Sequence, residues 1–236
     1  MKKALILLII TLHINTVFAQ QYDTKPLLDS IKKKMNRVTD YSADIQIKLN
    51  VSFIKIPVKS ATIYFKKPNK VKMKTEGFAM LPKQSASFNA ADFLNKDFSS
   101  FYVKSEKING VQNDVVKVVP MSSDGEIILA TMWIDRKKQL VNKIDATTKS
   151  NGNFLLEFRY PKTPNPYEMP DLLKFTLDIT KTTLPVSITG DFDSDQRIKK
   201  SDEAKKQKAT LSISYSNYKI NTGIPDSFFI EEKKKK

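Results

Sequence analysis

The chain lacks cysteine altogether, and its only histidine among 236 residues is His13. Without cysteine, it can be neither stapled by disulfides nor anchored through a lipidated N-terminal cysteine. Because His13 lies in a segment that we expect to be cleaved, the mature chain would have neither thiol nor imidazole. That excludes Ser-His-Asp and Cys-His catalysis, zinc sites with nitrogen or sulfur ligands, and histidine acid–base chemistry. We therefore expect no enzyme and no cofactor, and a hydrolase built on paired carboxylates is the disfavoured alternative.

Long apolar runs are also scarce, and the N-terminus holds the notable one at residues 4–11. It follows Lys2 and Lys3 and precedes a small-residue cleavage site at residues 17–19, the order typical of a secretory signal peptide over residues 1–19. The run is too short to span a bilayer. We therefore expect an exported, periplasmic protein that is soluble after cleavage, with one β-rich domain over residues 20–232 and a basic tail over residues 233–236.

The stretch from Tyr41 to Lys74 alternates apolar and polar residues, with a break at the Lys-Pro-Asn of residues 67–69. Successive side chains of a strand point to opposite faces, so these strands would have one dry face and one wet face. An antiparallel sheet with one apolar face must cover that face with something. The apolar side chains that we place there are Ile45, Ile47, Leu49, Ile63, Phe65, Val71 and Met73.

Short motifs follow one another along most of the chain. They are V-x-x-Y-S-A-D-I at 38–45, I-Y-F-K-K-P-N-K at 63–70, D-x-x-x-x-L-V at 135–141 and N-x-G-I-P-D-x-x-F at 221–229. Their order resembles the LolA family of lipoprotein-sorting proteins. The resemblance implies a mainly β (α+β) fold: a single antiparallel half-open β-barrel, with an N-terminal helix and short lid helices over an apolar concave face that shelters acyl chains. It also implies a hairpin at 135–141 and a last strand at 221–229.

Two segments would close the mouth of such a barrel. Residues 23–38 carry helix signals, since Thr24 can cap the first turn and Pro26 lies within it, and they place one apolar stripe along the helix. Residues 78–98 include a short helix begun by Asn89 and read equally as a mobile lid or as a core-packing loop. From this second segment, Phe78 and Met80 complete the predicted ligand site.

The net charge of +15 invites anionic partners, and in an exported protein it favours lipid headgroups or an acidic protein surface. Lys70, Lys72 and Lys74 share one face of a predicted strand. They form either a basic stripe for an anionic membrane surface or an ordinary wet strand face, where lysine discourages edge pairing. Aromatic residues do not interleave with the basic ones as a nucleic-acid platform requires, so we expect no nucleic acid. The alternating carboxylates of residues 191–195 read as a charged turn, and we expect no metal.

The sequence therefore predicts a carrier or chaperone that binds lipid or lipoprotein acyl chains in an apolar cavity. It would help to sort them to the outer membrane, between membrane-anchored donor and acceptor proteins. The alternative is a non-enzymatic periplasmic sensor or envelope scaffold on the same fold. An open apolar cleft would indicate a carrier, whereas an interior filled by its own side chains would indicate a scaffold.

Overall fold

The computed structural model describes residues 22–51, 54–55, 57–75, 94–122, 125–149, 152–178 and 208–230. The predicted signal peptide and basic tail lie outside these ranges, as do Phe78, Met80, Asn89 and the carboxylates of residues 191–195. The expectations placed on them stay predictions.

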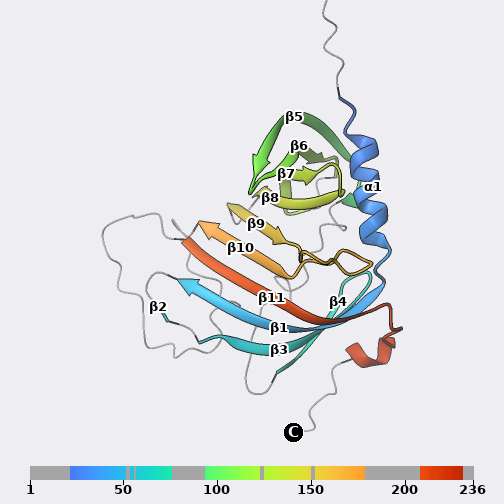
Figure 1. The fold of residues 1–236 in the computed structure, drawn as a ribbon, viewed down its shortest axis with the longest axis vertical. Coiled ribbons are helices and arrows are strands. Elements are labelled where there is room, and N and C mark those ends of the chain that lie inside the picture. Colours follow the sequence, from blue (N-terminus) through green and yellow to red (C-terminus); the bar gives the residue numbers. More distant parts are fainter. Residues whose placement is uncertain are drawn as a thin grey trace, which may run out of the picture.

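Most of the described chain is β-strand (Figure 1). The helix α1 (Lys25–Asn36) comes first, and the 3₁₀ turn η1 (Asp226–Phe229) comes last. Between them lie β1 (Asp40–Val51), β2 (Ile54–Lys55), β3 (Lys59–Lys66), β4 (Lys70–Thr75), β5 (Phe98–Ile108), β6 (Val111–Pro120), β7 (Ile127–Asp135), β8 (Leu140–Thr148), β9 (Asn153–Arg159), β10 (Leu172–Asp178) and β11 (Lys208–Ile220).

These strands form one antiparallel sheet in the order β4-β3-β1-β11-β10-β9-β8-β7-β6-β5, with β2 paired to β1. The sheet curls strongly, and α1 runs along one side of the curl (Figure 1). Among the described strands, β4 and β5 remain the two unpaired edges, so the barrel is not closed. The predicted hairpin at residues 135–141 is the β7–β8 turn, in which Asp135 pairs with Leu140. The half-open antiparallel β-barrel predicted from the sequence is confirmed.

The predicted alternation sets the two faces of the sheet correctly. Ile47 lies opposite Ile213 of β11, and Phe65 lies opposite Val71 of β4. All seven predicted sheet positions therefore share the concave, apolar face, because residues paired across strands point to the same side. The break predicted at residues 67–69 is also present, since β3 ends at Lys66 and β4 begins at Lys70.

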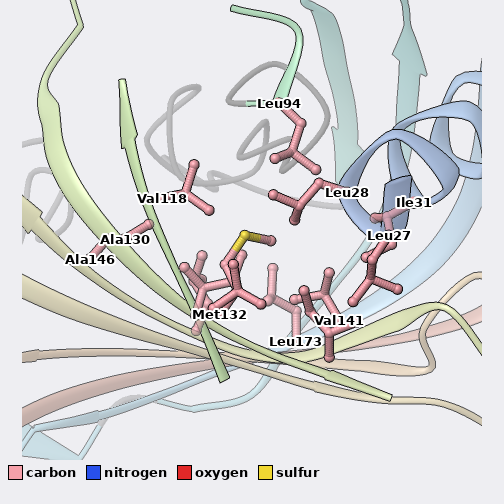
Figure 2. Packing of buried hydrophobic residues seen from close by; sticks show 14 residues of the cluster. Leu27, Leu28, Ile31, Leu94, Val118, Ala130, Met132, Val141, Ala146 and Leu173 are labelled. Atoms are coloured by element: carbon pink, nitrogen blue, oxygen red, sulfur yellow. The ribbon is translucent and has the colours of Figure 1, made fainter. Parts of the chain in front are cut away.

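Two groups of buried side chains fill the concave face. The first joins α1 to strands β6–β10, and Figure 2 shows Leu28 and Ile31 of the helix facing Met132 of the sheet. The second lies on β1, β3 and β11, with Ile45, Ile63 and Ile213 at its centre. The helix stripe predicted from the sequence thus packs on the sheet, as an amphipathic helix requires.

The start of α1 differs from the prediction in one detail. Pro26 does occupy the first turn, but Thr24 makes no capping hydrogen bond with its side chain. The Thr24 hydroxyl instead shares a 2.6 Å hydrogen bond with the hydroxyl of Ser100 on β5. The capping role expected for Thr24 is therefore wrong, and its side chain ties the helix to an edge of the sheet. Among the described residues, no helix is long and apolar enough to cross a bilayer.

The motif at residues 221–229 is not a strand, because β11 ends at Ile220. The buried carboxylate of Asp40 accepts hydrogen bonds from the backbone N–H groups of Thr222 and Gly223. Gly223 has a φ of 75°, which glycine adopts without steric cost. The chain then continues into η1, which packs beside β4. These hydrogen bonds, together with that of the Asn221 side chain to the Arg37 carbonyl, hold the segment after β11 at the junction of α1 and β1.

Candidate ligand cavity

An apolar cavity of about 160 Å³ lies between the C-terminal half of α1 and the concave face of the sheet. The helix, the β7–β8 turn, the loop between β9 and β10, and strands β1, β3 and β11 all contribute to its wall. Its lining is mostly aromatic and apolar. The residues that matter below are Lys34, Met35, Tyr41, Phe65, Tyr160, Tyr167, Glu168, Tyr215 and Tyr218.

Aromatic rings from three neighbouring strands stack along one side of this cavity. Tyr41 stacks on Phe65 with ring centroids 5.2 Å apart, and it meets Tyr218 edge-on at 5.7 Å. Tyr215 and Tyr218 stack in parallel at 5.8 Å. Such stacked and edge-on pairs stabilise beyond the area that they bury, so the rings of this wall support one another.

A β-bulge in β11 explains why Tyr215 and Tyr218 face the same side. Strand residues three apart should point to opposite faces. Here the β1–β11 register shifts between Ser42 and Asp44, and Asn217 of the bulge has a φ of 53°. The Asn217 side chain donates a 2.9 Å hydrogen bond to the Asp44 carboxylate on the convex side, which holds the bulge in place. The bulge therefore turns Tyr218 into the cavity wall, a common use of this irregularity.

Burial keeps the cavity phenols neutral. It raises the pKa of Tyr41 to about 12, and it also raises the pKa values of Tyr160, Tyr215 and Tyr218. Two of these hydroxyls have protein partners: Tyr160 donates to the Val141 carbonyl and Tyr218 to the Pro170 carbonyl, both at 2.9 Å. Desolvation disfavours a phenolate, so all of these groups act as neutral donors at physiological pH.

Charged contacts join α1 to the loops at the rim of the cavity. Lys34 pairs with Glu168 of the β9–β10 loop and also donates to the Lys138 carbonyl of the β7–β8 turn. One turn further, Arg37 donates to the Pro166 carbonyl at 3.3 Å and lies 5.4 Å above the Tyr167 ring. We call these the rim contacts. They hold the end of α1 against the loop that closes the cavity from the other side.

The predicted site residues that the structure describes lie on the correct face, but they divide between two environments. Phe65 lines the cavity. Ile45, Ile47 and Ile63 are buried in the second cluster, at 5% exposure or less. Leu49, Val71 and Met73 are partly buried against the same cluster. Whether a ligand touches these residues stays a prediction.

Sequence reasoning missed the tyrosines of the cavity wall. Tyr41 and Tyr215 follow the same odd-numbered alternation as Ile45 and Ile213, so the pattern could have placed them. Tyr218 could not be found that way, because the bulge at Asn217 breaks the alternation. The β9–β10 loop carries no periodicity at all, and its place at the rim depends on long-range contacts.

The lysines of the predicted stripe contact another segment of the same chain, the 3₁₀ turn η1. Lys66 and Lys70 pair with Asp226 of η1 at 2.7 and 2.8 Å. Farther along β4, Lys72 donates to the Phe228 carbonyl at 2.6 Å, and the ammonium groups of Lys72 and Lys74 each lie 4.9 Å from the centre of the Phe228 ring. In this structure, the lysine-bearing face of β4 is thus covered in part by η1.

No group of three or more acidic side chains in the described ranges is placed to hold a metal ion. The charged residues of the described cavity lining, Lys34 and Glu168, are paired with each other.

Comparison with known proteins identifies the fold. No family model and no curated protein matches the chain by sequence. Among solved structures it is similar to a DUF1329 family protein from Desulfovibrio piger, with a TM-score of 0.55 and 11% identity over 88% of this chain and 97% of that one. It is also similar to a LolA superfamily protein from Nitrosomonas europaea, with a TM-score of 0.52 and 10% identity over 86% of this chain and 97% of that one. The resemblance to the LolA family is thus confirmed at the level of the fold.

Proposed function

We propose that this protein is a periplasmic, non-enzymatic carrier that binds lipid or lipoprotein acyl chains and helps to sort them to the outer membrane. The observation that carries the proposal is the aromatic, apolar cavity between α1 and the concave face of a LolA-type sheet. Burial of apolar surface supplies the driving force, at about 0.8 kcal/mol per methylene. Such a carrier needs no covalent chemistry to extract its cargo.

The size of the cavity defines how the carrier would work. A volume of about 160 Å³ matches cavities that hold a benzene-sized group, whereas pockets for larger ligands span roughly 300–1,000 Å³. The described arrangement therefore admits the first part of a ligand. A whole acyl chain requires α1 to separate from the β9–β10 loop, which breaks the rim contacts. We infer that loading and release involve this separation, aided by membrane-anchored donor and acceptor proteins.

A packed interior favours the second candidate, a periplasmic sensor or envelope scaffold on the same fold. Leu28, Met132 and Ile144 are examples of side chains in the first cluster that are almost completely buried against one another. A scaffold would keep this interior closed and would use an outer surface for its partner. The two candidates differ in whether the cavity takes up an acyl chain.

Uptake of a fluorescent fatty acyl probe by the purified protein distinguishes them. Met35→Trp adds volume to the wall of the cavity, and Ile128→Trp places the same side chain at an exposed position outside its lining. A carrier binds the probe in the parent chain and in Ile128→Trp, and it loses at least tenfold in affinity in Met35→Trp. Melting temperatures measured in parallel show whether overpacking has unfolded the chain. No uptake by the parent chain would favour the scaffold.

A further inference from the structure

Two tyrosine hydroxyls of the cavity have no hydrogen-bond partner in the described part of the chain. Among the described residues, no fully buried polar side-chain atom is left unpaired. Tyr41 and Tyr215 nevertheless make ring contacts but no hydrogen bond through their side chains to any described residue. Their oxygens must therefore border open space. Both residues line the cavity, so the cavity is the space that we assign to them.

A phenol in an apolar wall normally finds a partner, because leaving its O–H unpaired costs free energy. A phenylalanine at position 41 or 215 would supply the same ring to the wall without an O–H group to satisfy. Phe65, in the same wall, is such a residue. The hydroxyls of Tyr160 and Tyr218 do find backbone carbonyls. Among the described residues of this wall, Tyr41 and Tyr215 are therefore the tyrosines whose hydroxyls can donate to a molecule that enters the cavity.

The charges around the cavity indicate what that partner is. Lys34 is the basic residue of the lining, and it is paired with Glu168. Asp171, next to the loop, is paired with Arg159 at 2.9 Å. No cation of the described lining is therefore free to neutralise a buried carboxylate or phosphate, and burying an unpaired anion is expensive. A neutral oxygen is the group that fits.

We propose that the cavity binds the neutral oxygen of an apolar ligand, an ester carbonyl or an alcohol, through hydrogen bonds with the hydroxyls of Tyr41 and Tyr215. This proposal rests on the proposed carrier function and adds to it the class of head group that the cavity selects. An acyl ester, rather than a free fatty acid, is the cargo that matches. The ring stacking of Tyr41 on Phe65 and of Tyr215 on Tyr218 fixes the position of both donors.

The proposal can be tested with small probes that have similar shapes and are small enough to fit the cavity. Toluene, benzyl alcohol and benzoate are titrated into the parent chain, Tyr41→Phe, Tyr215→Phe and the double variant, with binding followed by NMR shifts of the cavity residues. The double variant should bind benzyl alcohol about three- to tenfold more weakly, the range expected for one or two lost hydrogen bonds. Its affinity for toluene should be unchanged, and benzoate should bind the parent chain more weakly than benzyl alcohol.

Tyr64→Phe is the matched control, because Tyr64 contacts Phe228 of η1 and is not part of the cavity lining. It should leave all affinities unchanged. The single and double cavity variants should melt close to the temperature of the parent chain, since the hydroxyls that they lose make no hydrogen bond to any described residue. Equal binding of benzyl alcohol by the parent chain and the double variant would overturn the proposal while leaving the carrier function intact, and so would tighter binding of benzoate. Failure of toluene to bind the parent chain would overturn both.

Discussion

Single side chains on the two faces of β1 should respond very differently to an added charge. Ile47 is 5% exposed on the concave face, and its neighbour Gln46 is exposed on the convex face. We predict that Ile47→Glu lowers the free energy of unfolding by about 3 kcal/mol or more, because an unpaired carboxyl enters a packed cluster. Gln46→Glu should stay within about 0.5 kcal/mol. Urea denaturation measures both.

The comparison at residues 46 and 47 also tests the strand register. A slip of one residue would exchange the two faces, so equal effects at the two positions would contradict the β1–β11 pairing. Because Ile47 lies in the packed cluster and not in the cavity wall, its loss of stability reports on packing. A variant of Ile47 that lost lipid uptake but kept its stability would instead move the ligand onto this cluster.

The cavity tyrosines give a prediction for alkaline pH. Burial raises the pKa of Tyr41 to about 12, and those of Tyr160, Tyr215 and Tyr218 are raised as well. A pKa raised by folding contributes stability that is complete below pH 10 and is lost as the pH rises, because only the unfolded chain ionises readily. Ultraviolet titration should therefore show these phenols ionising together with unfolding. Smooth ionisation of every tyrosine near pH 10 in the folded chain would contradict the buried wall.

Asp226 gives a prediction for acid pH at the other surface. The ammonium groups of Lys66 and Lys70 lower the pKa of this carboxyl to about 2. A lowered pKa contributes stability that is present above about pH 4 and is lost as the pH falls towards 2. Carboxyl NMR should give a midpoint near 2 for Asp226 and a value near 4 in the Lys66→Ala, Lys70→Ala double variant. A normal midpoint in the parent chain would contradict the ion pairs of Asp226 with Lys66 and Lys70.

At the scale of elements, α1 is the element that must move if the cavity is to open. Its rim contacts join it to the β9–β10 loop through Lys34 and Glu168, whose side chains are 20% and 25% exposed. We predict that Glu168→Gln weakens this attachment by about 1 kcal/mol, which speeds amide hydrogen exchange in α1 roughly fivefold and quickens probe uptake. Hydrogen–deuterium exchange measures the first effect.

Glu157→Gln is the control for the helix prediction, since Glu157 pairs with Lys174 across β9 and β10 on the face of the sheet opposite α1. It should leave exchange in α1 unchanged. Faster uptake without faster exchange in the helix would point to another route into the cavity.

Elements with regular patterns could be predicted from the sequence, and those fixed by tertiary contacts could not. The alternation around Ile45 and Ile47 gave the correct face because each strand there follows the period of two. The prediction failed at residues 221–229, where the Asp40 carboxylate binds two backbone N–H groups and holds the chain out of the sheet. The Tyr218 side chain was unpredictable because the bulge at Asn217 depends on Asp44 of another strand.

At the scale of the whole molecule, the sheet has an apolar concave face and carries several lysines on the outer face of β3 and β4. The whole chain has a net charge of +15, and four of its lysines, Lys66, Lys70, Lys72 and Lys74, contact η1. An anionic membrane would have to compete with Asp226 for the first two of these lysines. A role of the β4 lysines at a membrane surface therefore remains a proposal, and it requires η1 to move.

The central claim is that the interior of this molecule carries an acyl ligand. Native mass spectrometry of the full chain purified from the cell envelope, beside Met35→Trp prepared in the same way, tests it most directly. We predict an added lipid mass on the parent chain, which is released on unfolding and is strongly reduced in Met35→Trp. If the parent chain shows only the mass of the polypeptide and takes up no acyl probe afterwards, the carrier function is contradicted. The envelope scaffold would then be the better proposal.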